Sequence, residues 1–428
     1  MTESSSVNRR HFVQGTAALS AATLASGAFA RAAAPNRVSK LRYGVIGCGG
    51  RGTGAAVNAL EASPDVEIVA LADVVADRLA GAKQGLAELE GDLSKRVQVD
   101  AKNCFVGFEA YQELCSLDLD VVILATAPGF RPIHLAAAIA AGKHAFMEKP
   151  AGVDPTGVRS VLDSAAKARA KKLSIVAGTQ RRHEQCYREA MARVKDGAIG
   201  EITHANCYWN QGGLWVKPRE QGWSDTEWQV RNWLYFAWLS GDHICEQHVH
   251  NLDVCNWAIG SHPLRATGMG GRQVRVAPEY GNIFDHFAID YEYANGVRVS
   301  SYCRQIDGCA SRVEEIIHGT EGVLYTASNR AEIVGKQPWK FTGEQPNPYV
   351  QEHADLIAAI QNGTPVDEAT AVAESTLTAV MGRMSAYTGK ELTWEQALAS
   401  KLDLVPARCT MGPLAIEPVA VPGKTPFV

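Results

Sequence analysis

The chain has 428 residues, of which 46% are hydrophobic and 21% are charged, a balance typical of globular proteins with two domains, or three at most. Its 42 Lys and Arg against 46 Asp and Glu leave a formal net charge of −4. No basic block is present that could follow a phosphate backbone, which argues against nucleic acid as a partner. Beyond residue 36, no apolar run is long and charge-free enough to cross a bilayer.

Residues 1–36 are predicted to be an export signal and linker. Arg9 and Arg10 precede a weakly apolar stretch over 15–30, and residues 28–30 (AFA) form a small-x-small cleavage site. Paired arginines before such a stretch are typical of the twin-arginine export machinery, which carries folded proteins, and they predict a periplasmic protein. A chance Arg-Arg pair and an uncleaved anchor are the alternatives.

The next part of the chain alternates short apolar runs with amphipathic segments. Strands are predicted over 41–47, 66–73, 121–128, 144–150 and 173–180, and helices over 51–60, 133–141 and 155–170. Near-continuous apolar strands that alternate with helices predict a doubly wound parallel sheet, so we expect an α/β Rossmann domain over 37–182.

The remaining residues have a different pattern. A helix over 183–195 precedes a strand over 200–210, and two hairpins are predicted around 294–296 and 319–322. The tail over 349–398 is mostly helical in pattern. We therefore predict an α+β domain over 183–428 with a broad, open, mainly antiparallel sheet.

A glycine-rich loop follows the first strand and fits the pattern GxGxxG. Gly47 permits a tight turn, Gly49 lets the backbone approach a pyrophosphate, and Gly52 lets the helix pack on the strand. The helix start would then offer free N–H groups to the phosphates. The loop contacts predicted for a dinucleotide are Gly47, Cys48, Gly49, Gly50, Arg51 and Gly52. The alternative is a glycine-rich turn with no nucleotide.

Asp73 ends the second predicted strand and would accept hydrogen bonds from the ribose hydroxyls. Its charge would repel a 2′-phosphate, which favours NAD over NADP, although Arg78 lies nearby in sequence. Further predicted cofactor contacts lie at the ends of later strands. These are Thr126, Pro128, Glu148 and Lys149.

Lys149, in the sequence Glu148-Lys149-Pro150, closes a predicted strand and would therefore point at the cofactor crevice. A lysine there can hold a substrate hydroxyl or alkoxide, and its pKa falls when it is desolvated. A solvated surface lysine is the alternative.

A helix predicted from Asp242 would gather His243, Glu246, His250 and Asp253 on one face, at spacings of three, four and three. A histidine one turn from a carboxylate can serve as a general base that its neighbour orients. Two alternatives are a solvated polar face and a metal site formed by the first three of these residues. That spacing lacks the HExxH pattern, and the ten cysteines contain no CxxC pair, so no metal is predicted.

Seven of the nine tryptophans fall between Trp209 and Trp257. Flat apolar rings among polar side chains are typical of a sugar site, and a tryptophan-rich core or interface is the alternative. The predicted substrate contacts are Arg182, Tyr208, Trp209, Asn210, Trp233, His243 and His250.

These features together resemble the glucose–fructose oxidoreductase/inositol dehydrogenase/MocA (Gfo/Idh/MocA) family over nearly the whole chain after the leader. The resemblance rests on the loop at 47–52, on Glu148-Lys149-Pro150 and on the helix that carries His250. It implies that Lys149, Glu246 and His250 surround the nicotinamide ring and the substrate carbinol. Asp is usual in the family where this chain has Glu246, and Gly is common where it has His248.

The resemblance implies an NAD-dependent oxidoreductase that acts on a sugar or polyol hydroxyl, in a homodimer or homotetramer formed through the sheet. His250 would take the hydroxyl proton with Lys149 assisting, while the hydride passes to C4 of NAD. An exported enzyme could not replace released NADH, so we expect a non-dissociating cofactor that is recycled in the site. Besides a sugar–sugar oxidoreductase, a redox-neutral glycosidase acting through a transient keto-sugar and a non-catalytic sugar-binding protein stay open.

Overall fold

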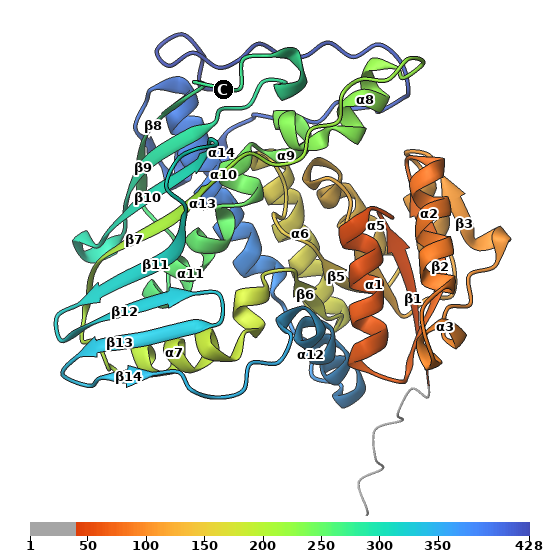
Figure 1. Ribbon diagram of the computed structural model, residues 1–428, viewed down its shortest axis with the longest axis horizontal. Helices are drawn as coiled ribbons and strands as arrows, with labels where there is room; N and C mark the ends of the chain where they lie inside the picture. Colours follow the sequence, from red (N-terminus) through yellow and green to blue (C-terminus); the bar gives the residue numbers. More distant parts are fainter. Residues whose placement is uncertain (1–39) are drawn as a thin grey trace, which may run out of the picture. The chain divides into compact units, whose positions relative to one another are not determined.

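A computed structural model describes residues 40–428, and the predicted export signal lies outside the described residues. Two sheets with their helices make up this part of the chain (Figure 1). No helix among residues 40–428 is long and apolar enough to cross a membrane.

The first sheet has six parallel strands in the order β3-β2-β1-β4-β5-β6. Its strands are β1 (Leu41–Ile46), β2 (Val66–Asp73), β3 (Cys104–Val106), β4 (Val121–Leu124), β5 (His144–Met147) and β6 (Ile175–Ala177). Helices cover both faces, so the central strands are buried almost throughout, as the apolar runs predict. The predicted doubly wound parallel sheet is confirmed.

The helices of this layer connect its strands. They are α1 (Gly50–Ala62), α2 (Ala76–Ala87), α3 (Asp92–Lys95), α4 (Ala110–Cys115), α5 (Arg131–Ala140) and α6 (Pro155–Lys171). A later helix, α12 (Pro348–Asn362), returns to pack on α1. Residues after 183 therefore also cover the first sheet, and the domain boundary at residues 182 and 183 stays a prediction.

The second sheet has nine strands in the order β14-β13-β12-β11-β7-β10-β9-β8-β15. They are β7 (Ile202–Gln211), β8 (Arg265–Gly271), β9 (His286–Glu292), β10 (Arg298–Gln305), β11 (Arg312–Gly319), β12 (Gly322–Ala327), β13 (Arg330–Gly335), β14 (Trp339–Lys340) and β15 (Leu392–Thr393). All neighbouring pairs are antiparallel except β7 with β10. The predicted broad, mainly antiparallel sheet is confirmed, and both predicted hairpins form in it.

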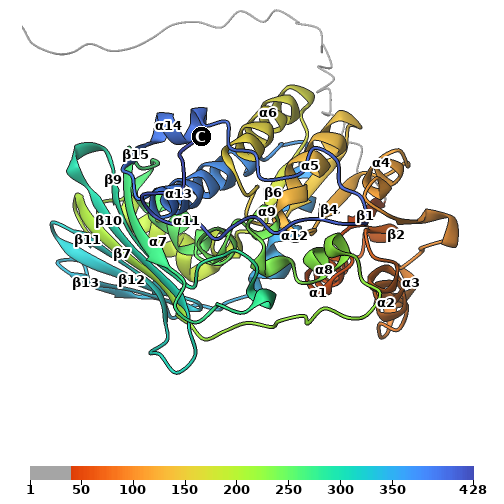
Figure 2. The same cartoon turned by 90° about the horizontal axis from the view of Figure 1, so that it is seen from above.

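Helices cover one face of this sheet. Figure 2 shows α7 (Gln185–Lys195), α11 (Val249–Ile259) and α13 (Ala369–Thr388) along that face, while no described helix lies on the other. Burial accordingly alternates along β10 and β12, as expected for a sheet packed on one side. The remaining helices are α8 (Asp225–Arg231), α9 (Ala237–Ser240), α10 (His243–Glu246) and α14 (Trp394–Ala399).

The strands predicted over 121–128 and 173–180 are shorter in the structure, and two further differences concern the candidate site. β5 ends at Met147, so Glu148-Lys149-Pro150 follow the strand. The single helix predicted from Asp242 is wrong, because a turn at Gln247 and His248 separates α10 from α11. At this turn the His248 ring reaches the second sheet, where its Nε2 lies 2.7 Å from Ser301 Oγ. This tertiary contact overrides the helical pattern.

The C-terminal segment after α14 crosses from the second sheet to α8 (Figure 2). There Gly412 O accepts a hydrogen bond from Thr226 N at 3.1 Å, and Leu414 O accepts one from Gln229 Nε2 at 2.9 Å. These bonds hold α8 in place from outside. The segment leading to α8 and the end of α8 line the cleft described next.

Candidate active site

The glycine-rich loop forms a cradle at the carboxyl end of β1. Gly47 has a φ of +99°, a conformation that favours glycine, and a Cβ on Gly52 would lie 1.7 Å from the Gly47 carbonyl oxygen. Gly49 caps α1 without a side-chain hydrogen bond, and the first turn holds no acidic residue. The first N–H groups of α1 are therefore open to an anion.

A cleft of about 890 Å³ opens over this cradle. A Cβ built on Gly49 or Gly50 would meet nothing within 4 Å, so there is room beside the backbone for a pyrophosphate. The cleft is lined by Gly47, Cys48, Gly49, Gly50, Arg51, Thr53, Gly54, Val57, Asp73, Val74, Arg78, Gly81, Ala82, Ala125, Thr126, Ala127, Phe130, Trp215, Lys217, Val230, Arg231 and Trp233.

Asp73 lies in this cleft at the end of β2, where the sequence predicts a ribose ligand. Its Oδ2 accepts a hydrogen bond from Cys48 N at 2.6 Å, and its Oδ1 accepts one from Val75 N at 2.8 Å. Burial raises the pKa of Asp73, whereas these bonds and the charge of Arg78 lower it in part. Each oxygen keeps a lone pair for a ribose hydroxyl, so cradle and carboxylate together fit a dinucleotide such as NAD.

The far wall of the cleft comes from the other half of the chain, in the segment Leu214–Trp233. Arg231 pairs with Asp77 of α2 at 3.0 Å, and its carbonyl oxygen accepts a hydrogen bond from Arg78 Nη2 at 3.1 Å. Trp215 and Lys217 line the same wall. The first turn of α2 is thus joined across the cleft to the last residue of α8. We call the three residues that make these contacts, Asp77, Arg78 and Arg231, the clasp.

The other predicted cofactor contacts fall into two groups. Thr126 lines the cleft, whereas Pro128 is buried at the start of a 3-10 turn over Pro128–Phe130. The side chains of Arg51 and Glu148 form an ion pair with each other, and Arg51 also pairs with Glu352 of α12 at 3.4 Å. Glu148 therefore anchors the loop to the end of β5, and the loop's backbone faces the cleft.

Lys149 follows β5 and meets α10. Its Nζ lies 3.0 Å from Glu246 Oε1 and donates a second hydrogen bond, at 2.5 Å, to the Glu246 carbonyl oxygen. Both side chains are about nine-tenths buried, at 12% and 9% exposure. Glu246 Oε2 is buried without a hydrogen-bond partner among the described residues. The structure thus brings together two of the three predicted catalytic residues.

His250 lies in the first turn of α11 and stacks on Trp209 of β7, with ring centroids 5.7 Å apart and planes 22° apart. Burial, together with the positive charges of Lys149 and Arg181, holds the pKa of His250 well below its ordinary value. Its Nδ1 is buried and has no partner in the described part of the chain. A neutral imidazole with an unpaired nitrogen can accept a proton at neutral pH.

His243 does not join these residues. Its Nδ1 lies 3.0 Å from Asp242 Oδ1, and its ring packs 5.1 Å from that of Phe287. The helix that would have aligned His243 with Glu246 and His250 is broken, and the three side chains have separate partners. No group of three His, Cys, Asp or Glu arranged to hold a metal ion occurs among residues 40–428.

The predicted substrate contacts are distributed over three places. Arg182 forms a bidentate pair with Asp253 of α11, at 2.8 and 2.9 Å, one turn beyond His250. Trp209 lies beside His250, whereas Trp233 lines the cofactor cleft.

Tyr208 and Asn210 alternate with Trp209 along β7, so they lie on the outer face of the second sheet. Tyr208 stacks there on Tyr302, and the Arg312 guanidinium lies 3.8 Å from its ring centroid. The structure therefore does not place these two residues beside His250.

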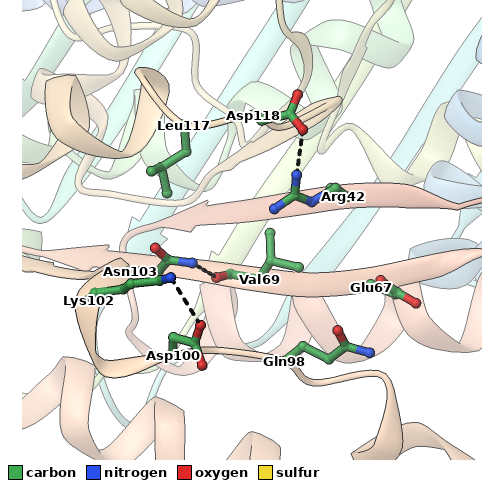
Figure 3. Close-up of a pocket in the computed structure, with 9 residues that line it drawn as sticks. All are labelled: Arg42, Glu67, Val69, Gln98, Asp100, Lys102, Asn103, Leu117 and Asp118. Carbon is green, nitrogen blue, oxygen red and sulfur yellow. Dashed lines mark hydrogen bonds and ion pairs between the residues drawn. The ribbon is translucent and has the colours of Figure 1, made fainter.

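A second hollow, of about 530 Å³, lies near the amino ends of β1 and β2 (Figure 3). Its charges are paired: Arg42 contacts Asp118 at 2.5 Å, and Lys102 contacts Asp100 at 3.8 Å. Ligands of open parallel sheets bind at the opposite, carboxyl ends of the strands. This hollow is therefore not a candidate active site.

Apart from Trp233, the residues of the far wall of the cleft and the buried charges near His250 were not predicted as site residues. Lys217 lies in a loop and Arg231 ends the short helix α8, and both are more than 100 residues beyond the glycine-rich loop. Arg181 and Glu315 pair across 134 residues of sequence. The tryptophan cluster was the available signal for the wall, and a buried charge within an apolar strand was the signal for Glu315.

Comparisons with known proteins agree with this fold. Residues 41–177 match the family described as "Oxidoreductase family, NAD-binding Rossmann fold", and residues 187–325 match "GFO/IDH/MocA C-terminal domain". The chain belongs to the Gfo/Idh/MocA oxidoreductase family, as the sequence resemblance predicts.

Three similar proteins illustrate the match. An inositol 2-dehydrogenase of Rhizobium meliloti is 22% identical over 338 residues, 76% of this chain and 90% of that protein. An aldose-aldose oxidoreductase from Caulobacter crescentus, complexed with glycerol, superposes with a TM-score of 0.65 at 16% identity over 83% of this chain and 99% of its own. A levoglucosan dehydrogenase in complex with NADH and levoglucosan superposes with a TM-score of 0.66 at 16% identity, over 83% of this chain and 99% of its own.

Proposed function

We propose that this protein is an exported NAD-dependent oxidoreductase that transfers hydride from a sugar or polyol hydroxyl and keeps its cofactor bound between half-reactions. The observation that carries the proposal is the cluster of Lys149, Glu246 and His250 beyond the strand β5, in a sheet whose glycine-rich cradle fits NAD. The names of the similar proteins, which are dehydrogenases or oxidoreductases of inositol, levoglucosan and aldoses, support a sugar or polyol as the substrate class.

The residues of the cluster have separate tasks. His250 accepts the proton of the substrate hydroxyl, which its neutral state at pH 7 permits. Lys149 donates a hydrogen bond to the same oxygen and stabilises the negative charge that develops on it. Glu246 holds the Lys149 ammonium in place through the 3.0 Å contact.

NAD bound in the cradle would supply the hydride acceptor, C4 of its nicotinamide, for oxidation of the substrate carbinol to a carbonyl. The two electrons of the C–H bond leave with the hydride, and the proton stays on His250. A second sugar carbonyl can take back both, so the protein's residues return to their starting protonation. The loop Gly47–Gly52 would hold the pyrophosphate, and Asp73 would hold the adenosine ribose, which favours NAD over NADP.

The clasp supports retention of the cofactor. Residues 215–233 cover the cleft and are tied to α2 through Asp77, Arg78 and Arg231, so the adenosine half would leave only after these contacts open. A protein exported through the twin-arginine route would carry its cofactor with it, because that route transports folded proteins.

The first experiment measures bound cofactor. Protein purified from the exported fraction is dialysed and then denatured, and the released nicotinamide is identified and quantified. We expect about one NAD(H) per chain, unchanged by dialysis, and conversion of a sugar pair without added cofactor. A site that never retains NAD(H) would overturn the recycling proposal.

The same preparation separates the alternatives. Net conversion of one sugar with reduction of another supports the oxidoreductase, whereas cleavage of a glycoside without net redox change identifies a glycosidase. Bound sugar with neither reaction identifies a binding protein.

Export is tested separately. Replacing Arg9 and Arg10 with Lys is expected to leave the protein in the cytoplasmic fraction, because the twin-arginine route requires the pair. Periplasmic recovery of the double variant, equal to that of the wild type, would contradict the route.

We also propose a homodimer or homotetramer formed through the open face of the second sheet. Met269 and Tyr302 lie on that face at 73% and 39% exposure, and Tyr302 stacks there on Tyr208. Light scattering on the wild type and on Met269→Asp tests this; a monomer in the wild type would contradict it.

A further inference from the structure

The carboxylate of Glu315, in the middle of β11, is completely buried and gathers donors from four other elements. Its Oε1 accepts hydrogen bonds from Arg181 and from Asn251 Nδ2, the latter at 2.6 Å. Its Oε2 accepts them from the Tyr187 hydroxyl at 3.0 Å and from Thr326 Oγ1 at 2.7 Å. One side chain thus links the 3-10 turn η3 (Gln180–His183), α11, α7 and β12.

Such a pair is a poor way to stabilise a fold. The Arg181 side chain is 4% exposed and that of Glu315 is 0% exposed, so both charges lose their water. The cost of this desolvation offsets most of the attraction, and apolar replacements of a buried ion pair are often neutral or stabilising. We therefore examine which neighbouring groups the ion pair of Arg181 and Glu315 holds in place.

The first group it holds is the ring beneath His250. The Arg181 guanidinium lies 5.5 Å from the ring centroid of Trp209, and Trp209 stacks on His250 at 5.7 Å. Trp209 Nε1 donates to Gln211 Oε1 at 2.8 Å, which fixes the indole in its plane. Arg181 and His250 both lie against the Trp209 ring, and the ion pair with Glu315 holds Arg181 in that position.

The second group is the start of α11. Asn251 follows His250 directly, and its Nδ2 donates to Glu315 Oε1 and to the Tyr208 carbonyl oxygen at 3.1 Å. These bonds tie the first turn of α11 to β11 and β7. Rotation of that turn would move the His250 ring relative to Lys149.

Charge is the third consideration. The charged groups on the elements around this end of α11 are Lys149, Glu246, Arg181, Arg182, Asp253 and Glu315. Glu246 and Lys149 pair with each other, as do Asp253 and Arg182, and Cys207 and Tyr187 are further titratable groups nearby. Lys149 and Arg181 oppose a positive charge on His250, and Glu315 keeps Arg181 in place.

We propose that Glu315 is a positioning residue for the proton acceptor: through Arg181 and Asn251 it fixes the plane of the His250 ring and keeps a cation behind it. This inference rests on the proposed function, in which His250 takes the substrate proton.

Three variants test it. Glu315→Gln keeps the shape but removes the charge, and it leaves Arg181 buried without its counter-ion. The pair variant Arg181→Met with Glu315→Leu replaces both charges by apolar groups of similar size and is expected to fold. Glu314→Gln is the matched control, since Glu314 points to the outer face and pairs there with Arg312 and Arg330.

The readouts are the titration of His250 by NMR, in protein labelled with ¹⁵N-histidine and assigned with His250→Asn, and steady-state kinetics of polyol oxidation. In the pair variant we expect the His250 titration midpoint to rise toward that of an ordinary histidine. We expect kcat to fall by about tenfold with KM within twofold, a fraction of the roughly 10²-fold that a 1 Å misplacement costs. Glu315→Gln is expected to lower kcat similarly without changing NADH affinity, and Glu314→Gln to match the wild type.

A folded pair variant with an unchanged His250 titration and an unchanged kcat would overturn the proposal and leave Glu315 a purely structural residue. Thermal unfolding of each variant identifies a folding failure, and where Glu315→Gln does not fold, the pair variant decides. If the wild type oxidises no sugar or polyol, the proposed function fails, whereas the NMR titration still decides whether Glu315 and Arg181 control His250.

Discussion

The candidate active site has a proposed cofactor end and a proposed proton-transfer end, and the two are built in different ways. At the cofactor end, six consecutive residues, Gly47–Gly52, form the cradle almost alone, because a turn and the helix start that follows it supply the binding groups. At the proton-transfer end, Lys149, Glu246, His250 and Trp209 come from three separate stretches of chain. The first end is a local structure, and the second exists only when the two sheets are assembled.

The two ends also use charge differently. The cradle offers backbone N–H groups and has no acidic residue in the first turn of its helix. The proton-transfer end buries charged side chains in pairs, such as Lys149 with Glu246 and Arg181 with Glu315. Substitutions at the two ends should therefore separate cofactor binding from chemistry.

The largest effect is expected at Lys149. Lys149→Met removes the proposed hydrogen-bond donor to the substrate oxygen and leaves Glu246 without its ion-pair partner, so kcat should fall by about 10²- to 10⁴-fold. NADH affinity, measured by fluorescence titration, should change little, because the cradle is untouched. Lys167→Met, at an exposed ion pair of α6, is the control. A Lys149→Met enzyme with full activity would remove the catalytic assignment.

Gly52→Ala should break the cofactor end. Its Cβ would overlap the Gly47 carbonyl oxygen at 1.7 Å, so we expect a loss of about 2 kcal/mol or more in the free energy of unfolding and weaker NADH binding. Gly85→Ala is the matched control, because a Cβ there in α2 meets nothing within 4 Å. That variant should gain about 0.5–1 kcal/mol. Urea unfolding measures both, and equal stabilities would contradict the close approach.

A smaller effect is expected for pH dependence at the cofactor end. His353 of α12 packs 4.2 Å from the Phe146 ring, and burial, with the charges of Arg51 and His183, lowers its pKa to about 3. Unfolded histidine has a pKa of about 6.5. Between these values the unfolded chain binds a proton that the folded protein does not, so stability falls as the pH falls through this window.

His353→Phe removes this contribution. The free energy of unfolding of the variant should decrease less between pH 6.5 and 5 than that of the wild type. Burial and the charge of Arg131 also lower the pKa of His134 to about 3. His134 therefore contributes to the pH dependence of the free energy of unfolding in both proteins. Urea unfolding at several pH values measures the two slopes, and identical slopes would show that His353 does not titrate on unfolding.

The smallest effect is expected at the clasp. Arg231→Gln removes the 3.0 Å contact with Asp77, whose side chain is 64% exposed, and pairs this exposed contribute at most about 1 kcal/mol. We therefore expect NADH to dissociate up to about fivefold faster, with kcat for chemistry unchanged. Arg219→Gln, which breaks a pair with Asp225 within the same segment, is the control for stopped-flow measurements. Equal dissociation rates in both variants would mean that the clasp does not retain the cofactor.

Much of the fold was predictable. The buried strands of the first sheet, their helices and the hairpins of the second sheet all follow from local apolar periodicity and turn residues such as Asn295 and Gly296. The break between α10 and α11 was not predictable, because it accompanies the contact of His248 with Ser301, and no local sequence pattern indicates that contact.

The candidate site likewise contains some residues whose positions were predicted and others whose positions were not. Lys149, Glu246 and His250 were predicted from the sequence as catalytic residues. The structure brings Lys149 to Glu246 and places His250 close enough for the Lys149 charge to act on it, and their catalytic role stays a prediction. His243 was placed with them by helical spacing, whereas in the structure it pairs with Asp242. Tyr208 and Asn210 share a strand with Trp209 but face away from it, since successive side chains of a strand point to opposite sides.

The sequence by itself determined the class of fold, the dinucleotide cradle and its acidic partner Asp73, because a strand, a glycine turn and a helix start act over a few neighbouring residues. Only the tertiary structure decided what stands behind His250 and what closes the cleft. Arg181 meets Glu315, and Arg231 meets Asp77, across more than 130 residues of chain. Such pairs form only when particular surfaces pack together, and local sequence propensity does not specify which surfaces those are.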